Sequence, residues 1–356
     1  MMSANRARAV FIAGPSRSGT ALVRSLVNRH PDVHVANETH YFDDLRRTVP
    51  ATGVLGPEDQ RIAIDYFRAL THRPYGHFGD PAAGWLEVDE LTARAMELGG
   101  RADDFLRAYC ELSARRERGT PAAVWGEKTP RHIFRVDDIL TAFPDAKIIA
   151  MVRDPRAVVA SYKKWQNRGG LPGSDDAEHE AKLAAEEERT RRSYHPLLLA
   201  LLWRGQANAA TAAQRSHGAA KVRVQRYEDL VTRPEEATRS LTEWLGLDYS
   251  PEMLDVPMHN SSFSTFEESR GVSAEAVARW RGVLDGAEVA VVQRSCARLM
   301  DAYDYAPIET DLGVLERARP YATFPAASLR AARANNDRSG GLSSYVLRRV
   351  RALVSG

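Results

Sequence analysis

Cysteine, long apolar runs and an excess of one charge are all scarce in this chain of 356 residues. Cys110 and Cys296 can form at most one bridge and lack metal-ligand spacing, which excludes a disulfide scaffold and a cysteine metal centre. The 49 Lys and Arg residues nearly balance the 47 Asp and Glu residues, so no general attraction to nucleic acid is expected. No stretch approaches the roughly 18 apolar residues of a membrane span or has the pattern of a secretory leader. We therefore expect a soluble, cytoplasmic protein from a reducing compartment, with no nucleic-acid partner.

The chain does have enough hydrophobic residues, 44%, for a full globular core. They are arranged in short apolar runs, each followed by an amphipathic stretch. The pairs are 9–13 before 20–29, 123–125 before 131–141, 147–152 before 156–165, and 222–226 before 234–245. This alternation is typical of an α/β fold with a central parallel sheet flanked by helices. Ligands of such folds bind at the carboxyl ends of the strands.

The segment after the first apolar run is rich in glycine and polar residues. Gly14 and Gly19 have the G-x-x-x-x-G spacing of a nucleotide P-loop, but Thr20 and Ala21 stand where a Walker A motif has Lys and Ser or Thr. The missing lysine and hydroxyl disfavour triphosphate chemistry with Mg²⁺. Backbone N–H groups at the start of the following helix, together with the cation Arg17, still form an anion site that needs no metal. The alternative is that the glycines only turn a strand into a helix.

This loop, with the motifs that follow it, resembles the 5′-phosphosulfate loop of sulfotransferases that use 3′-phosphoadenosine 5′-phosphosulfate (PAPS). The resemblance implies a P-loop-like α/β fold, PAPS as the donor, adenosine 3′,5′-bisphosphate as the product, and no metal. The chain departs from the family at Ala21, where many members have a second Thr, so one hydroxyl donor is missing. The residues expected to hold the phosphosulfate are Pro15, Ser16, Arg17, Ser18, Gly19, Thr20 and Ala21.

A second anion site is expected where the run 147–152 ends. Asp154 is a favourable N-cap and Pro155 a favourable first helical residue, which holds Arg153 at a strand-to-helix junction. Ser161 follows two turns along the helix, so a guanidinium and a hydroxyl can both reach a phosphate. The pair resembles the 3′-phosphate motif of the sulfotransferases. The alternative is that Arg153 pairs with a structural carboxylate.

Lys128 lies in the segment 124–132, whose sequence is common in bacterial and tyrosylprotein-type sulfotransferases just before the 3′-phosphate strand. In sulfuryl transfer, negative charge grows on the bridging oxygen of the leaving bisphosphate. A fixed ammonium at that oxygen stabilises the transition state more than the ground state. Lys128 is predicted to be this cation, with Arg17 sharing the role from the other side. The alternative is an exposed lysine in a turn.

A base must take the proton of the acceptor hydroxyl as it attacks. The segment 30–40 contains His-Pro and Glu-Thr pairs like those of tyrosylprotein-type sulfotransferases, whose catalytic base falls on Glu38. We expect Glu38 to be ionised near Arg17, because an adjacent cation lowers the pKa of a carboxyl group. Other sulfotransferases use His or Glu elsewhere in the chain. The alternative bases are His34, His40 and His132.

Three shorter matches complete the expected donor site. Tyr227 follows the run 222–226 and resembles a family tyrosine near the adenosine, where its ring can pack on the base; a core role is the alternative. The segments 260–263 and 278–282 resemble the part of the family that closes over PAPS. They add Ser262, Arg279 and Arg281, with Arg279 at the position of a family lysine and Arg281 as the competing choice.

The resemblance spans about 10–305. We therefore place one sulfotransferase domain over residues 1–312 and a C-terminal tail over 313–356, because the regular pattern fades after Pro307. A mostly helical insertion over about 60–118 is expected on the acceptor side. These boundaries keep the regions that mainly carry the resemblance, 10–40, 124–163 and 222–250, in a single domain.

Two further segments have two interpretations each. The Gly-rich stretch 167–174 with the charged helix 175–192 is either a lid or an ordinary surface loop and solvated helix. Residues 345–354 place apolar side chains at helical spacing opposite arginines. Packing of that helix on the body of the protein is favoured over contact with a membrane surface.

The sequence thus predicts a PAPS-dependent sulfotransferase that moves a sulfuryl group in line to an acceptor hydroxyl on a carbohydrate, a glycolipid or a small natural product. A tyrosylprotein sulfotransferase is an alternative, because the base motif resembles that class. A P-loop kinase-like transferase is disfavoured by the missing Walker lysine. A non-catalytic nucleotide-binding interaction protein is disfavoured by Arg17, Glu38 and Lys128. The sequence sets no oligomeric state.

Overall fold

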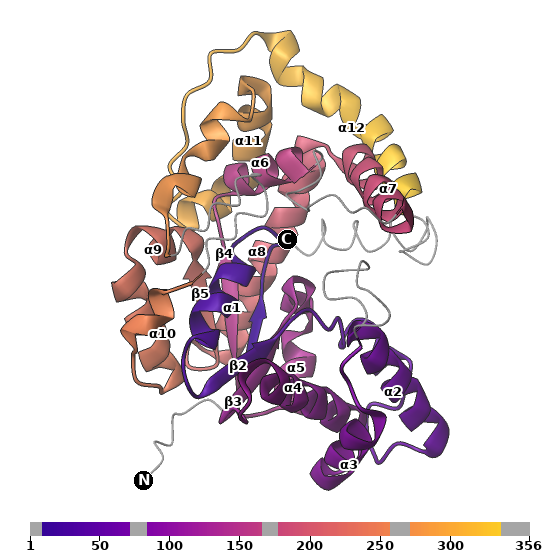
Figure 1. Ribbon diagram of the computed structural model, residues 1–356. Helices are drawn as coiled ribbons and strands as arrows, with labels where there is room; N and C mark the ends of the chain where they lie inside the picture. Colours follow the sequence, from indigo (N-terminus) through magenta and orange to yellow (C-terminus); the bar gives the residue numbers. More distant parts are fainter. Residues whose placement is uncertain (1–8, 72–83, 166–176, 257–270, 336–356) are drawn as a thin grey trace.

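The computed structural model describes residues 9–71, 84–165, 177–256 and 271–335, and its centre is a five-stranded sheet (Figure 1). The strands stand in the order β2-β3-β1-β4-β5 and pair in parallel. Their bounds are β1 Ala9–Ala13, β2 Val33–Ala36, β3 Val124–Lys128, β4 Ala146–Val152 and β5 Val222–Arg226. Because β3, β1 and β4 are neighbours, their carboxyl ends meet at one edge of the sheet, where ligands of such folds bind.

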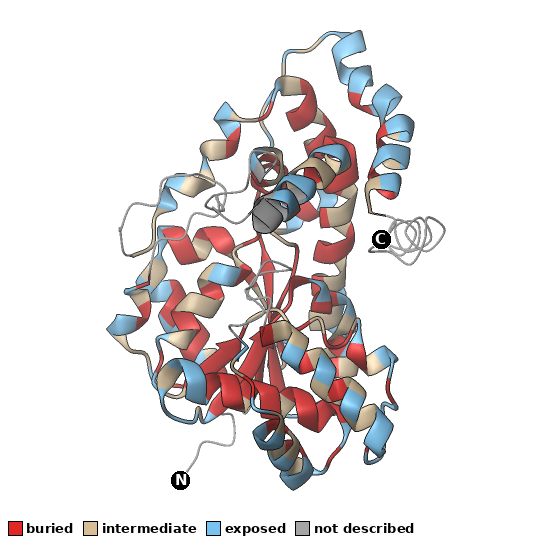
Figure 2. Ribbon diagram, turned by 45° about the vertical axis from the view of Figure 1, so that its right-hand side comes forward, coloured by how far each residue is buried: buried red, intermediate tan, exposed pale blue. Residues whose placement is uncertain are grey.

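Both faces of the sheet are buried, as its parallel strands require (Figure 2). Phe11 packs into one apolar cluster while Val10 and Ile12 pack into the other, following the period of two along β1. The Val10 face is covered by α1 Thr20–Asn28, α9 Tyr227–Thr232 and α10 Pro234–Leu245. The Phe11 face is covered by α4 Ala102–Arg118, α5 Val136–Ala142 and α8 Pro196–His217. This sandwich fixes the strand ends in place.

The remaining helices lie around this core. The insertion between β2 and β3 consists of α2 Pro57–Thr71, α3 Val88–Leu98 and α4. A third apolar cluster joins α6 Pro155–Trp165, α8 and α11 Gly286–Ala302. Helix α7 Ala177–Ser193 lies beside α12 Val314–Ala334 (Figure 1). The described chain also has short 3₁₀ helices, which are η1 Leu45–Arg47, η3 Pro130–Arg135, η5 Pro251–Leu254, η6 Ala274–Val277 and η7 Arg279–Gly282.

The predicted α/β alternation is confirmed. The four apolar runs form β1, β3, β4 and β5, and the amphipathic stretches after the first, third and fourth form α1, α6 and α10. The expected helix 131–141 is instead divided into the 3₁₀ helix η3 and the short α5. The expected helical insertion is also present, and the described part of the charged stretch 175–192 lies in α7.

Several elements were not predicted, among them strand β2 and the helices α8, α9, α11 and α12. Strand β2 has only four residues, and its histidine interrupts the apolar pattern, yet all four are buried. Helix α12 occupies 314–334, inside the expected tail, in spite of Pro320 and Pro325. Three of its four buried residues, Pro320, Ala327 and Ala331, lie on one helical face, and α12 contacts α7, α8 and α11. The candidate helix 345–354 and the candidate lid loop 167–174 lie outside the described residues. Within the described residues, none of the helices is both long enough and apolar enough to cross a membrane.

Candidate functional site

The loop between β1 and α1 has a backbone that only glycine accommodates at two positions. Gly14 has φ +132°, and a Cβ there would lie 2.2 Å from the carbonyl oxygen of Met151. Gly19 has φ +86°, and a Cβ there would lie 2.4 Å from Cδ2 of Tyr227. Because glycine precedes α1, no N-cap side chain covers the first N–H groups of that helix. The loop therefore presents backbone donors at a helix N-terminus, as an anion site needs.

Polar side chains of the loop point into the protein. Ser18 is fully buried, and its Oγ has no hydrogen-bond partner among the described residues. Arg17, itself at φ 70°, donates from Nε to Oγ of Ser161 at 3.0 Å. Thr20 is buried, whereas Ala21 is exposed on the first turn of α1. The loop and helix α6 are thus joined through Arg17 and Ser161.

Arg153 stands at the end of β4 and contacts the same loop. Its Nη1 donates to the carbonyl oxygen of Arg17 at 3.2 Å, and its Nη2 donates to the carbonyl oxygen of Ala276 at 3.1 Å. Its guanidinium lies 4.2 Å from the ring centroid of Tyr227, a cation–π contact. Its buried Nε has no partner within the described part of the chain. The four predicted residues Arg17, Arg153, Ser161 and Tyr227 therefore converge.

The alternative role of Arg153, pairing with a structural carboxylate, does not match these contacts. Among the described residues it forms no ion pair, and the carboxylate next to it in sequence, Asp154, is held by Arg156 at 2.7 Å. Asp154 also accepts the backbone N–H of Arg156 at 2.8 Å, which is its expected capping role on α6. No carboxylate holds the Arg153 guanidinium in the described part of the chain, so its N–H groups can donate toward the loop.

Lys128 and Glu38 face each other at the ends of neighbouring strands. Lys128 Nζ lies 2.6 Å from Glu38 Oε1, and the Lys128 side chain is 3% exposed against 33% for Glu38. Lys128 is thus a buried strand-end cation and not an exposed turn lysine. His40 Nε2 lies 3.4 Å from the other carboxylate oxygen, Oε2. The cation beside Glu38 is therefore Lys128, whereas Arg17 contacts Ser161.

This pairing keeps Glu38 ionised. Burial raises the pKa of Glu38, but the charge of Lys128 and hydrogen bonds from His40 and Lys128 outweigh burial and lower that pKa from 4.5 to about 2. Burial lowers the pKa of His40, but the hydrogen bond and charge of Glu38 reverse the effect and the pKa of His40 is raised. A carboxylate in this state is ionised at neutral pH, as a base must be, and the same lowered pKa makes it a weak base while Lys128 holds it.

The other candidate bases are buried in polar contacts of their own. His34 bonds to Ser113 Oγ at 3.0 Å, and burial with the charges of Arg24 and Arg118 lowers the His34 pKa to about 4. His132 is fully buried, with Nδ1 2.6 Å from Glu127 Oε1. The candidates that reach the surface are Glu38, which pairs with Lys128, and His40, which lies beside Glu38.

The late segment 278–282 makes fewer described contacts with the other candidate residues. Arg279 Nη2 donates to Glu275 at 2.9 Å, and its charge acts on the pKa of Tyr227, which burial raises. Arg281 is exposed and lies 4.8 Å from the ring centroid of Trp280. Its described contacts do not join it to the loop. Ser262 lies outside the described residues.

Glu127, which lies in the segment 124–132, is a functional residue that the sequence analysis did not identify. It is fully buried beside Lys128 and accepts hydrogen bonds from Thr39 and Thr129. A signal was available in the sequence, because Glu127 closely follows the apolar run 123–125, and a carboxylate buried at a strand end needs hydrogen-bond or ion-pair partners.

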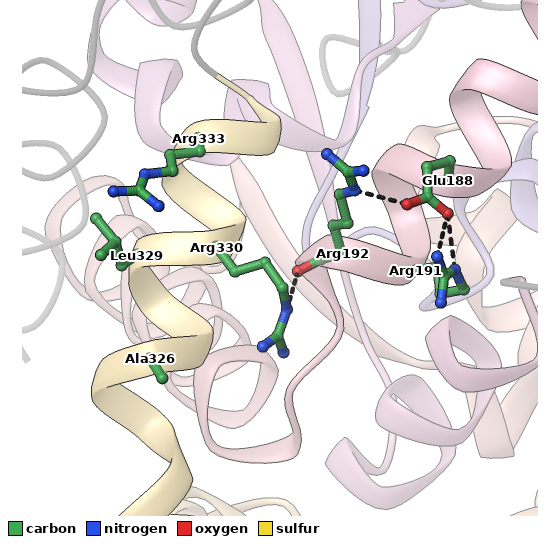
Figure 3. Close-up of a pocket in the computed structure, with 7 residues that line it drawn as sticks. All are labelled: Glu188, Arg191, Arg192, Ala326, Leu329, Arg330 and Arg333. Atoms are coloured by element: carbon green, nitrogen blue, oxygen red, sulfur yellow. Dashed lines mark hydrogen bonds and ion pairs between the residues drawn. The ribbon is translucent and has the colours of Figure 1, made fainter.

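A pocket of about 760 Å³ lies elsewhere, between α7 and α12 (Figure 3). Its charged lining is Glu188, Arg191, Arg192, Arg330 and Arg333. Glu188 pairs with both Arg191 and Arg192, at 2.5 and 2.6 Å. None of the predicted site residues lines this pocket. In the described parts of the chain, no group of three or more His, Cys, Asp or Glu is placed to hold a metal ion.

The sheet order, the glycine loop and the converging strand ends define a P-loop-like α/β protein with a candidate anion site. The model of the sulfotransferase family matches residues 9–251, and the chain belongs to this family. It is 24% identical to a protein-tyrosine sulfotransferase of Drosophila melanogaster over 87% of this chain and 52% of that protein. It is 28% identical to nodulation protein NoeE of Sinorhizobium fredii, over 67% of this chain and 50% of that protein. The chain thus spans about half the length of these two relatives.

Two solved structures also align with this chain. The sulfotransferase domain of the Synechococcus olefin synthase aligns with a TM-score of 0.49 at 18% identity, over 88% of this chain and 99% of that domain. A sulfotransferase from Alicyclobacillus acidocaldarius aligns with a TM-score of 0.41 at 21% identity, over 85% of this chain and 97% of that protein.

Proposed function

We propose that this protein is a PAPS-dependent sulfotransferase that acts on an acceptor hydroxyl. The observation that carries the proposal is the meeting of an anion loop, the buried Lys128, the partly buried Arg153 and the ionised Glu38 at the ends of β1, β2, β3 and β4. Lys128 ends β3 and Arg153 follows β4, while the loop follows β1. The loop is tied to the end of β3, because Gly14 donates its N–H to the carbonyl oxygen of Pro130 at 3.0 Å.

The residues present suit an anionic donor. Ser18 Oγ and Arg153 Nε are buried polar atoms that have no partner among the described residues, and such atoms cost free energy unless a ligand or water satisfies them. The loop from Pro15 to Thr20 would hold the phosphosulfate, and Arg153 with Ser161 the 3′-phosphate. Bound there, PAPS would supply an activated sulfuryl group. Tyr227 stands next to Arg153 as the ring that would pack near the adenosine.

The chain's own residues would stabilise the charge that develops in the reaction and accept the proton of the acceptor hydroxyl. Lys128 would stabilise the negative charge that grows on the leaving side, with Arg17 contributing from the loop. Glu38 would accept the proton of the acceptor hydroxyl. An anion bound beside Lys128 shares its ammonium, which weakens the hold of Lys128 on Glu38 and makes Glu38 a better base.

The acceptor is proposed to be a hydroxyl on a carbohydrate, glycolipid or small natural product. The relatives are named as protein-tyrosine sulfotransferases, a nodulation protein and a carbohydrate sulfotransferase. A tyrosine hydroxyl therefore stays as the second candidate acceptor, favoured by the resemblance of the segment 30–40 to tyrosylprotein-type sulfotransferases.

Transfer of ³⁵S from labelled PAPS into a host extract, a glycan panel and tyrosine peptides tests the proposal. We expect label in a hydroxyl acceptor, and calorimetric binding of adenosine 3′,5′-bisphosphate without Mg²⁺. Binding of ATP·Mg²⁺ in preference to the bisphosphate would overturn the donor assignment and favour a kinase-like transferase. Bisphosphate binding with no transfer to any acceptor, extract included, would favour a non-catalytic nucleotide-binding protein.

A further inference from the structure

Glu127 is a fully buried carboxylate one residue before the candidate cation Lys128. Its Oε2 accepts from Oγ1 of Thr39 at 3.0 Å and from Oγ1 of Thr129 at 2.6 Å. Its Oε1 lies 2.6 Å from Nδ1 of His132. Burial raises the pKa of Glu127, but the charge and hydrogen bond of His132 and the bonds from Thr129 and Thr39 outweigh it, so the pKa is lowered. An ionised group with no exposed surface persists only with such a complete set of partners.

Glu127 and its partner Thr129 hold the backbone immediately after the candidate base. Thr39 N–H donates to Thr129 Oγ1 at 3.1 Å and to Glu127 Oε2 at 3.4 Å. His40 N–H donates to Thr129 Oγ1 at 3.3 Å. Since β2 ends at Ala36, the backbone after it no longer has sheet pairing to fix its course. Hydrogen bonds to the side chains of Glu127 and Thr129, at the end of β3, fix its course instead.

The same strand end is tied to the donor loop. Thr129 N–H donates to the carbonyl oxygen of Ile12 at 3.1 Å, and Gly14 N–H donates to the carbonyl oxygen of Pro130 at 3.0 Å. One hydrogen-bonded unit therefore connects the candidate base segment, the candidate cation and the start of the anion loop. A shift of Thr39 relative to Thr129 would move Glu38 relative to Lys128.

We propose that Glu127 is a positioning residue that acts through Thr39 and Thr129 to set Glu38 against Lys128 and His40. The proposal rests on the proposed function and extends it to a group that touches neither donor nor acceptor. In this proposal His132 serves as the buried partner of Glu127, and it is not the base.

Thr39→Val tests this positioning without a change of charge. The variant removes the hydroxyl that donates to Glu127 and keeps the backbone N–H bond to Thr129. We expect kcat to fall about tenfold or more, because small misplacements of reacting groups are costly. Binding of adenosine 3′,5′-bisphosphate should stay within about twofold, since Thr39 is not part of the loop. Thr39→Ser restores the hydroxyl and is expected to restore kcat to within about threefold.

Thr242→Val is the matched control. Thr242 is also fully buried, and its hydroxyl donates to the carbonyl oxygen of Thr238 at 3.1 Å inside α10. Thermal melting compares the loss of stability in the two variants. An equal fall of kcat in Thr242→Val and Thr39→Val would assign the effect to general destabilisation and overturn the proposal.

The titration of His40, followed by NMR on histidine-labelled protein and assigned with His40→Asn, reads the geometry without activity. Besides Glu38, the charges of Asp44 and Glu127 raise the pKa of His40, and burial lowers it. Thr39→Val leaves all these charges in place, so a fall of the His40 pKa would report movement of Glu38. An unchanged His40 pKa in Thr39→Val overturns the proposal. Wild-type protein that neither binds the bisphosphate nor transfers sulfate would refute the proposed function, while the His40 titration would still decide the positioning role.

Discussion

Nζ of Lys128 lies 2.6 Å from Oε1 of Glu38, so the candidate leaving-group cation and the candidate base neutralise each other. The two residues come from the ends of β3 and β2, which are neighbours in the sheet. A buried ammonium and a half-buried carboxylate at this distance each perturb the chemistry of the other. Variants of either residue therefore test both roles.

Replacing Lys128 by Ala should lower kcat by about 10²–10³-fold, because the growing charge on the leaving side loses its ammonium. Calorimetry should still find binding of adenosine 3′,5′-bisphosphate, since the loop and Arg153 are intact. Steady-state transfer from ³⁵S-labelled PAPS measures kcat. Unchanged turnover would remove Lys128 from the mechanism.

Glu38→Gln should reduce kcat by about 10²–10⁴-fold while the bisphosphate binds normally, because an amide cannot take the proton. Its carbonyl oxygen can still accept from Lys128, so thermal melting should find the fold retained. His40→Gln is the companion variant. If it abolishes transfer and Glu38→Gln does not, the base is His40.

The pH dependence of stability should differ between wild type and Glu38→Gln. The pKa of Glu38 is lowered from 4.5 to about 2 in the folded protein, so its ionised form stabilises the fold above the unfolded pKa. That contribution is lost as the pH falls from 4.5 toward 2. Urea unfolding of both proteins between about pH 6 and pH 3 should give a free-energy difference that shrinks at the acidic end. A constant difference would mean that the Glu38–Lys128 pair does not form in solution.

Arg153→Gln should weaken binding of adenosine 3′,5′-bisphosphate by about 10–100-fold, as expected for the loss of charge-assisted hydrogen bonds. Binding of adenosine 5′-monophosphate should weaken much less, because it lacks the 3′-phosphate. Competition calorimetry with both nucleotides measures the two losses. Equal losses would place Arg153 outside the 3′-phosphate site.

Gly19→Ala should both destabilise the protein and weaken bisphosphate binding. The new Cβ would lie 2.4 Å from the Tyr227 ring at a φ of +86°. Gly53→Ala is the matched control, because Gly53 has φ +83° and a Cβ added there would meet nothing within 4 Å. The control should cost about 1–2 kcal/mol from backbone strain and leave binding unchanged. If Gly19→Ala costs no more than the control, the loop does not pack on Tyr227 in solution.

Much of the fold follows from local pattern. The run 9–13 and the helix after Gly19 are adjacent in sequence, so their strand–loop–helix unit was predicted with nearly the observed bounds. Arg153 was likewise predicted at a strand-to-helix junction, since Asp154 and Pro155 begin a helix by local geometry. Strand β2 escaped prediction because four residues carry too little periodicity.

Helix α12 was missed for a related reason. Pro320 and Pro325 break the local pattern of a helix, and its buried face consists of small residues. Contact with α7, α8 and α11 compensates for these weak local preferences. Tertiary packing decided the secondary structure there.

The sequence by itself determined the anion loop, the strand-end arginine and the residue types of the site, because each depends on neighbours a few positions apart. The tertiary structure decided which of these groups face each other. Glu38 and Lys128 are 90 positions apart in the chain and meet because β2 pairs with β3. The same pairing places Thr39 on Glu127, and it buries His132 while His40 stays beside Glu38. Strand pairing is a long-range choice, made by burial of both faces of the sheet, and no local pattern of residues encodes it.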